Sequence, residues 1–445
     1  MPDPQIISLG CRLNIAESEA IRALTEGRDM VVINSCAVTN TAVAETRKAI
    51  RRARADRPGA EIVVTGCAAQ IDPAAFAAMA EVDRVLGNTE KLSGDAWAAP
   101  DRVLVGDIAM VRETAPHLAP AFSAHARAFV EVQNGCDHRC TFCVIPQGRG
   151  NSRSVPAGAA IDRIAALVEA GHREVVLTGV DLTSYGPDLP GAPTLGQLVE
   201  RILHHVPALE RLRLSSLDGI EIDDRLFALL TQEKRMMPHV HLSLQAGNDL
   251  ILKRMKRRHD RAQSVALVER LKTARPDIAI GADLIAGFPT EDDAMAADTL
   301  ALIDDCDVVH AHIFPYSERS GTPAARMPAV PVPVRKARAT RLREAGARRK
   351  AAWLQTLIGT KQDVLVERPG DRGHTPGFAE VLFPLPPVRP EPVEGQASPQ
   401  AAFSLESGAS TSSARSVEGA ARAPGSISTI HILATDGKTL TGIPA

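Results

Sequence analysis

Three cysteines lie close together in the middle of this 445-residue chain: Cys136, Cys140 and Cys143. Three thiolates at this spacing can bind three irons of a cubane 4Fe–4S cluster and leave the fourth iron without a protein ligand. A small molecule that carries an amine and a carboxylate can chelate that open iron. The spacing therefore predicts chemistry at the cluster in addition to electron storage.

A zinc site and a set of disulfides are the alternatives for this triplet. Structural zinc usually takes four ligands, and His138 lies inside the loop, where it is poorly placed to act as the fourth. The seven cysteines show no short-range pairing, which favours metal ligation in a reducing cytosol over disulfides. We therefore expect an iron–sulfur cluster, with Cys306 outside it as a core residue.

A second set of three cysteines is spread over the first part of the chain: Cys11, Cys36 and Cys67. Each follows an apolar stretch and a small residue, and each precedes a helix-like stretch, at 15–24, 43–55 and 73–80. Three consecutive strand–helix units predict a parallel sheet that brings the three thiols to one edge. We expect a second three-thiolate cluster there; the alternative is three buried cysteines that pack as small apolar residues.

Further strand–helix units surround the central triplet. A strand is predicted at 128–132, directly before the cysteines. Later strands are predicted at 174–179, 211–216, 239–244, 278–285 and 307–313. Helical spacing follows the first five of these strands. The alternation predicts a parallel sheet that forms a whole or partial barrel, with reactive groups at the C-terminal ends of the strands, where the triplet lies.

The segment around the triplet resembles radical S-adenosylmethionine enzymes. The stretches that carry this resemblance are 134–143, 177–180 and 281–291. In that family Cys136, Cys140 and Cys143 would hold the cluster, and the methionyl amine and carboxylate of S-adenosylmethionine would chelate the open iron. The resemblance also implies that Gly179 lies along the methionine moiety and that Ile285 packs near the adenine. Phe142, beside the last cysteine, is a third expected cofactor contact.

Two three-cysteine sites on one chain resemble the methylthiotransferase family, whose members attach a methylthio group to an unactivated carbon. The chain is most similar to the branch that acts on threonylcarbamoyladenosine beside the tRNA anticodon. The resembling stretches are 9–14, 85–91, 177–181 and 314–327. Ser35 stands where this branch often has threonine, and Asp181 stands where histidine is frequent. We expect neither to touch a cluster ligand.

The chain after residue 355 has a different pattern. Strands are predicted at 362–367, 378–383, 427–433 and 440–443, which indicates a small antiparallel barrel. Its position and the stretch 373–381 resemble the TRAM module that binds tRNA in this family. Residues 384–424 are rich in Pro, Ser, Ala and Gly, so we expect a disordered insertion in a barrel loop.

The fold class predicted from these patterns is α/β with three parts. We expect an N-terminal parallel-sheet domain that holds the auxiliary cluster, a partial (β/α)6 radical barrel, and a C-terminal TRAM-like β-barrel. The expected bounds are 1–110, a linker at 111–126, 127–352, and 355–445.

Composition adds little to this hypothesis. The net charge of −2 does not indicate nucleic-acid binding, although basic residues crowd two helix-like stretches, at 47–57 and 335–350. Such runs are usually solvated helix faces, and phosphate contacts are expected only because the resemblance supplies an RNA. No secretory signal or bilayer-spanning apolar segment is evident, so we expect a cytoplasmic monomer without a membrane partner.

The leading functional hypothesis is 2-methylthiolation of N6-threonylcarbamoyladenosine at position 37 of tRNA. It uses two molecules of S-adenosylmethionine, one for methyl transfer and one for radical generation. The expected cofactors are two 4Fe–4S clusters and S-adenosylmethionine; the expected partners are the tRNA anticodon stem-loop and an external electron donor. Sulfur insertion consumes a cluster or requires an external sulfide source, and no residue decides between them.

Three alternatives stay open at this point. The same chemistry could act on isopentenyladenosine in tRNA or on a ribosomal-protein aspartate. A different class is an iron–sulfur electron-transfer or scaffold protein. That class would need both clusters to be coordinatively closed, and the sequence offers only three cysteines to each.

Overall fold

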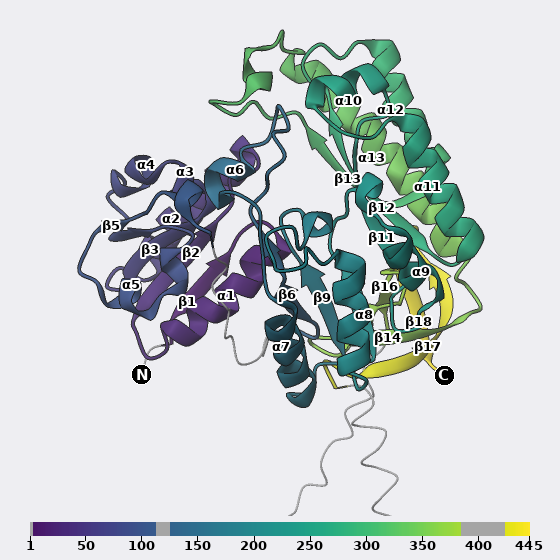
Figure 1. Cartoon of the computed structure of the whole chain (residues 1–445), viewed down its shortest axis with the longest axis horizontal. Helices are drawn as coiled ribbons and strands as arrows, with labels where there is room; N and C mark the ends of the chain where they lie inside the picture. The colour runs from purple at the N-terminus through teal and green to yellow at the C-terminus, as the bar shows by residue number, and fades with distance from the viewer. Residues whose placement is uncertain (1–2, 113–124, 384–422) are drawn as a thin grey trace, which may run out of the picture.

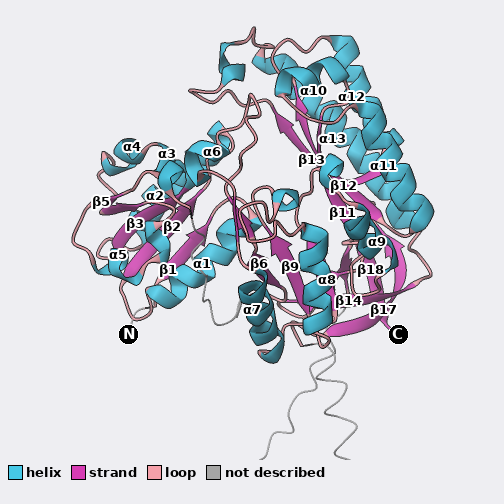
Figure 2. Cartoon of the chain, viewed as in Figure 1, coloured by secondary structure: helices cyan, strands magenta, loops and turns pink. Residues whose placement is uncertain are grey.

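The computed structural model describes residues 3–112, 125–383 and 423–445 (Figure 1). Most of the expected linker at 111–126 and of the expected insertion at 384–424 therefore lies outside the described residues. The described chain forms one five-stranded parallel sheet, two three-stranded parallel sheets, a two-stranded ribbon and a closed five-stranded barrel. Figure 2 shows helices and strands alternating through most of the chain.

The first sheet has the strand order β1-β2-β3-β4-β5, and all of its neighbouring strands are parallel. Its strands are β1 (Gln5–Ser8), β2 (Met30–Ser35), β3 (Glu61–Gly66), β4 (Arg84–Leu86) and β5 (Val103–Leu104). Its helices are α1 (Arg12–Leu24), α2 (Asn40–Asp56), α3 (Cys67–Ile71), α4 (Pro73–Ala77) and α5 (Gly94–Ala98). The three predicted strand–helix units are present, and β4 and β5 extend the sheet beyond them.

Six further parallel strands form the two three-stranded sheets. They are β6 (Ala128–Glu131), β9 (Glu174–Thr178), β10 (Arg211–Leu214), β11 (His239–Gln245), β12 (Ala279–Ala286) and β13 (Val308–Pro315). The sheet orders are β10-β9-β6 and β11-β12-β13, and isolated parallel bridges connect Leu212 with Met236 and Leu217 with Leu242. This arrangement is the predicted partial barrel of six strands, with β6 and β13 at its two ends.

Eight helices lie in this part of the described chain, most of them between consecutive strands of the barrel. They are α6 (Ile145–Arg149), α7 (Ala157–Glu169), α8 (Leu195–His205), α9 (Asp224–Gln232), α10 (Asp249–Met255), α11 (Arg261–Ala274), α12 (Asp293–Asp305) and α13 (Val332–Gln355). Short 3-10 helices lie at Glu90–Leu92, Ile108–Met110, Leu182–Ser184, Gly219–Glu221 and Pro323–Arg326. One apolar core runs through all six strands and includes Cys306, which is fully buried as predicted.

The C-terminal part is a closed barrel in the order β14-β15-β16-β18-β17. Its strands are β14 (Lys361–Glu367), β15 (Arg372–His374), β16 (Glu380–Leu382), β17 (Ile427–Thr435) and β18 (Leu440–Pro444). Four of its pairings are antiparallel, and β16 pairs with β18 in parallel. The predicted strand at 378–383 is shorter than expected, because Phe378 has a left-handed φ of 71° that a strand cannot contain.

Phe378 connects the C-terminal barrel to the floor of the radical barrel. Its ring lies against His239, with 5.3 Å between centroids, and under the guanidinium groups of Arg127 and Arg213 at 5.1 and 5.0 Å. His239 is the first residue of β11, so these contacts lie at the N-terminal edge of the strands. The C-terminal barrel therefore lies at the opposite edge from the Cys136 loop.

Glu174 supplies buried negative charge at this junction, where Glu367 of β14 also pairs with Arg127 at 2.6 Å. Glu174 is fully buried at the start of β9, and its carboxylate lies 3.0 Å from Arg127, 2.7 Å from Arg213 and 3.7 Å from Arg211. Burial alone would raise the pKa of Glu174, but the three guanidinium groups hold it at about 2. Arg213 also donates to the carbonyls of Thr375 and Pro376, and these bonds join the two barrels.

A second buried ionic group joins α1 to the radical barrel. Helix α1 packs on β1, β2 and β6 and so lies between the first sheet and the barrel. Its Glu17 is fully buried and pairs with Arg149 of α6 through both carboxylate oxygens and with Lys91 at 2.7 Å. These pairings lower the pKa of Glu17 to about 2 although burial opposes ionisation. One carboxylate thus serves two buried cations from separate parts of the chain.

Among the described residues, no helix is both long and apolar enough to cross a membrane.

Glu174→Gln should destabilise the protein by about 3–5 kcal/mol at pH 7, because three clustered guanidinium groups lose their shared carboxylate. Urea-induced unfolding followed by circular dichroism measures this. Glu200→Gln, which breaks an exposed pair with Arg225, is the control and should cost less than about 1 kcal/mol. Because the folded pKa of Glu174 is about 2 against an ordinary 4.5, its stabilisation is complete above pH 4.5 and is lost as the pH falls toward 2. A variant that differs equally from wild type at pH 2 and pH 7 would contradict this role.

Glu17→Gln should destabilise the cluster-free protein more than Arg149→Met does. The first change leaves two buried cations without their carboxylate, whereas the second leaves a balanced Glu17–Lys91 pair. The double variant Glu17→Gln/Arg149→Met should therefore be less destabilised than the sum of the single variants. Urea unfolding of the four proteins tests this, and strictly additive losses would show that the three charges act independently.

Candidate metal centres

The loop that carries the central triplet starts from a tight turn. Strand β7 (Gln133–Asn134) pairs antiparallel with β8 (Arg153–Ser154), and the cysteines lie between them. Gly135 has a φ of 72°, and a Cβ atom there would lie 1.9 Å from the carbonyl oxygen of Asn151. Only glycine fits this turn, after which the amide of Cys136 donates to the carbonyl of Gly150 at 3.1 Å.

The three thiols of this loop share one environment. Burial raises the pKa of Cys136, and Asp181, Cys143 and Cys140 raise it further. Burial raises the pKa of Cys143 to about 12, and Cys140 contributes to that rise. The structure therefore brings the three predicted thiols together at the C-terminal edge of the barrel. A metal cluster would offset the cost of ionising them, because coordinated thiols deprotonate.

Two donors point at individual sulfurs of this triplet. The backbone amide of Ile145 donates to Cys143 Sγ at 3.4 Å, and Arg257 Nη1 lies 3.7 Å from Cys140 Sγ. Hydrogen bonds and positive charge around a thiolate favour its anionic, metal-binding form. The surroundings therefore fit an anionic three-thiolate site.

Asp181 and His138 lie beside Cys136. Cys136 Sγ is 3.6 Å from Asp181 Oδ2, so the expectation that residue 181 does not touch a predicted ligand was wrong. His138 Nε2 lies 2.9 Å from the same carboxylate, and this hydrogen bond raises the pKa of His138. The imidazole of His138 thus pairs with a carboxylate beside the triplet.

The second set of cysteines also converges, although up to 56 residues separate its members. Cys11 precedes α1, Cys36 follows β2, and Cys67 begins α3 after β3. A Cβ atom on Gly10 would lie 3.0 Å from Cys36 Sγ, which shows how closely the first loop approaches the second. Burial raises the pKa of Cys36 to about 11, and Cys67 and Cys11 contribute. Cys11 keeps an exposed edge, although the surrounding protein raises the pKa of its thiol.

Ser35 stabilises the same edge of the first sheet. Its hydroxyl lies 3.2 and 3.3 Å from the backbone amides of Ala68 and Ala69, at the start of α3. It also donates to the carbonyl of Thr65 at 2.5 Å. Among the described residues, the Ser35 side chain makes no hydrogen bond to a cysteine sulfur, and its bonds stabilise the turn that carries Cys67.

Arg149 connects the second set to the barrel. Its Nε lies 3.2 Å from Cys67 Sγ, while its other nitrogens bind Glu17 and the side-chain oxygen of Asn14. Asn88 donates to the carbonyl of Gly148 at 2.5 Å, and its amide lies 3.8 Å from Cys67 Sγ. Helix α6 therefore rests directly on the second set.

The two cysteine sets are neighbours. Helix α6 begins two residues after Cys143 and ends with Arg149, beside Cys67. After burial and nearer groups, Cys67 also contributes to the raised pKa of Cys143. A further contact lies near Cys36, where Asn40 binds Ser317 and Glu318 of the barrel. The carboxyl edges of two separate parallel sheets thus lie next to each other, with α6 between the two cysteine sets.

The expected cofactor contacts fall into two groups. Phe142 and Ile285 belong to one apolar cluster beside the triplet, in which Phe142 meets Phe288 edge to face at 6.3 Å. Gly179 lies at the end of β9, where a Cβ atom would come within 2.9 Å of the Gln133 side-chain oxygen. Close packing on Gln133 is thus sufficient reason for glycine at 179.

Several charged and polar residues of the site were not predicted. Asn14, Asn88 and Lys91 lie in the stretches that carried the family resemblance, but their burial beneath the second cysteine set has no sequence signal. Glu17 and Arg149 lie on helices, where such residues are usually solvated. Only the position of Arg149, just past the triplet, could have drawn attention to it.

Comparisons with known proteins agree with this geometry. Residues 130–303 match the radical SAM superfamily, and residues 4–87 match a family described as uncharacterized protein family UPF0004. The threonylcarbamoyladenosine tRNA methylthiotransferase MtaB of Rickettsia prowazekii is 50% identical over 85% of this chain and 90% of its own length. The protein of the same name from Bacillus subtilis is 36% identical over 72% of this chain and 74% of its own length. The tRNA-2-methylthio-N(6)-dimethylallyladenosine synthase of Erythrobacter litoralis is 34% identical over 85% and 91%.

A solved structure supports the fold. The radical S-adenosylmethionine methyltransferase TsrM from Kitasatospora setae superposes with a TM-score of 0.52 at 16% identity, over 71% of this chain and 68% of that one. At this identity the similarity concerns the fold alone. The long matches to the curated relatives carry the family assignment: the chain belongs to the radical S-adenosylmethionine methylthiotransferase family, whose members use S-adenosylmethionine and two 4Fe–4S clusters.

Proposed function

We propose that the protein methylthiolates N6-threonylcarbamoyladenosine at position 37 of tRNA and uses two molecules of S-adenosylmethionine per product. The observation that carries this proposal is the pair of neighbouring three-thiol sites, which α6 connects. Each set lacks a fourth cysteine among the described residues, so each can leave one iron open for an exogenous ligand. One open iron suits S-adenosylmethionine, and the other suits the sulfur that is transferred.

Cys136, Cys140 and Cys143 would hold the radical cluster, and Cys11, Cys36 and Cys67 would hold the auxiliary cluster. When bound, these groups supply reductive cleavage of S-adenosylmethionine and a carrier for sulfur. The protein's own contribution is to position S-adenosylmethionine and to exclude water. The apolar pair Phe142 and Ile285 would exclude water beside the adenine, and Gly179 would lie along the methionine.

The substrate assignment rests on relative similarity. The chain is 50% identical to the Rickettsia protein, whose name specifies threonylcarbamoyladenosine, and 34% identical to the two synthases whose names specify dimethylallyladenosine. Other proteins named for threonylcarbamoyladenosine are only 33–36% identical to this chain. The Rickettsia match therefore supports the polar substrate over isopentenyladenosine. Two open three-thiol sites do not suit a closed electron-transfer scaffold.

Helix α2 offers a surface for the anticodon stem-loop. Arg47, Lys48, Arg51 and Arg52 are exposed on it, which suits contacts to phosphates. The second basic stretch, on α13, is less available than its composition indicates. Arg335 and Arg338 are buried there and bind the Val330 carbonyl and Glu291.

The remaining parts of the proposal are the domain bounds of 1–110, 127–352 and 355–445, a monomeric state, a cytoplasmic location and an external electron donor. The C-terminal barrel is proposed to be the TRAM-like module. Its attachment at the N-terminal edge of the strands separates it from the cysteine sites. Any RNA contact it makes would therefore involve a part of the tRNA away from the modified nucleoside.

Deletion of the gene provides the direct test of the substrate. Nucleosides from total tRNA are analysed by mass spectrometry. The 2-methylthio derivative of threonylcarbamoyladenosine should disappear, its unthiolated precursor should accumulate, and the 2-methylthio derivative of the dimethylallyl nucleoside should stay unchanged. Loss of the dimethylallyl product instead would transfer the assignment to isopentenyladenosine, and unchanged levels of both would contradict a tRNA substrate.

The triple variant Cys11→Ala/Cys36→Ala/Cys67→Ala should lose about half of its iron, because one of two four-iron clusters lacks its ligands. It should still cleave S-adenosylmethionine, yet fail to place sulfur on tRNA. Cys140→Ala should instead abolish that cleavage. Cys306→Ala is the matched control, since Cys306 is a buried core residue, and it should keep the full iron content. Methylthiolation that survives in the triple variant would leave those three residues as ordinary cysteines.

A further inference from the structure

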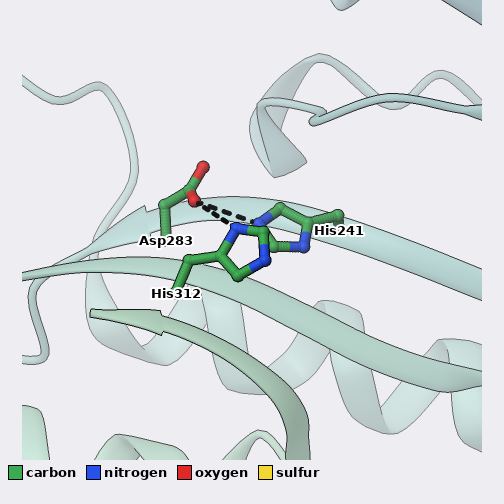
Figure 3. A group of neighbouring side chains, drawn as sticks. All are labelled: His241, Asp283 and His312. Carbon is green, nitrogen blue, oxygen red and sulfur yellow. Dashed lines mark ion pairs between the residues drawn. The ribbon is translucent and has the colours of Figure 1, made fainter. Parts of the chain in front are cut away.

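Three polar side chains from adjacent strands meet inside the radical barrel. His241 lies on β11, Asp283 on β12 and His312 on β13, and Asp283 is directly paired with His312 in the strand register (Figure 3). His241 is opposite Gly281, where a Cβ atom would lie 2.3 Å from His241 Nδ1. The glycine therefore leaves the room in which the imidazole turns toward Asp283.

The donor atoms of the three side chains converge on one point. Asp283 Oδ1 lies 3.1 Å from His241 Nε2 and 3.3 Å from His312 Nδ1, as the dashed lines in Figure 3 show. One ligand atom from each residue lies within 4.8 Å of the others. Ligands that occupy neighbouring positions about 2.1 Å from a metal ion are about 3 Å apart. The two contacts to Asp283 have this spacing.

The contact between His241 and Asp283 does not have the geometry of a regular hydrogen bond. The side chain of His241 is only 5% exposed, yet its Nε2 has no hydrogen-bond partner among the described residues, despite its short contact to Asp283. Burial opposes ionisation of Asp283, but the neighbouring His241 and His312 hold its pKa well below the usual range. An ionised carboxylate therefore faces two imidazoles, one of which has an unused buried nitrogen.

We propose that His241, Asp283 and His312 bind one divalent transition-metal ion. Two imidazoles and one carboxylate on one side of an ion leave its other positions open to exogenous ligands. The site has an open side, because the His312 side chain is 58% exposed whereas His241 is buried. Phe378 packs against His239, which precedes His241 by two residues on β11 and so lies nearer the N-terminal edge of the strand.

The open coordination positions of the ion indicate a function in substrate binding. Asp283 and Ile285 lie on the same face of β12, and two residues along a strand span about 7 Å. The ion would thus lie one step deeper in the barrel than the residue proposed to contact the adenine. On the proposed function, whose substrate carries a threonyl carboxylate and a hydroxyl, the ion would bind those oxygens and anchor the substrate's side chain.

The first measurement concerns the ion and does not depend on the substrate. Holoenzyme with both clusters is dialysed against buffered Zn²⁺, and zinc and iron are counted in the same sample. Wild type should bind about one zinc per chain at unchanged iron. Asp283→Asn and His312→Ala should lose the zinc while keeping the iron, and His205→Ala, which removes an exposed imidazole on α8, should keep both. Equal zinc in wild type and in the Asp283 and His312 variants, or none in any of them, would overturn the site.

The second measurement concerns the substrate. The dissociation constant of an anticodon stem-loop that carries threonylcarbamoyladenosine should rise about tenfold in His312→Ala, whereas that of a stem-loop with unmodified adenosine should not change. An unchanged preference in a variant that has lost its zinc would overturn the anchoring role and leave the metal site. If deletion of the gene spares the methylthio-threonylcarbamoyl nucleoside, the proposed function fails while the zinc result stands.

Discussion

The shared buried carboxylate of Glu17 is the interaction on which the arrangement of the two cysteine sets depends. It lies on α1, between the first sheet and β6, and holds Arg149 from the barrel and Lys91 from the first sheet. Charged groups are buried only when they are paired, so both buried cations depend on this one carboxylate. Because Arg149 Nε also lies 3.2 Å from Cys67 Sγ, a thiol at the edge of the first sheet contacts a residue from the radical-barrel part of the chain.

The fold and the cysteines were predictable because they follow from local rules. Alternating strand and helix patterns require parallel sheets, and parallel sheets place successive strand ends at one edge, so Cys11, Cys36 and Cys67 could be brought together without any contact information. The charged support could not be predicted. Burial of Glu17 and Arg149 is a property of packing between distant segments, and neither residue type indicates it.

Two further differences have the same cause. Phe378 begins a stretch of strand-like composition, yet it adopts a left-handed turn because its ring packs on three guanidinium groups and several imidazoles from other parts of the chain. Asp181 was expected to stay clear of the cysteines, but the loop after β9 returns it to Cys136. In both cases a tertiary contact determines the conformation or position of the residue, and the local sequence does not specify that contact.

The five residues of α6 have a consequence for how the metal centres assemble. This helix starts beside Cys143 and ends on Cys67, so ordering it for one set of thiols also orders it for the other. Any coupling of the two centres through α6 would be mutual, because thermodynamic linkage makes the effect of one centre on the other equal to the reverse effect.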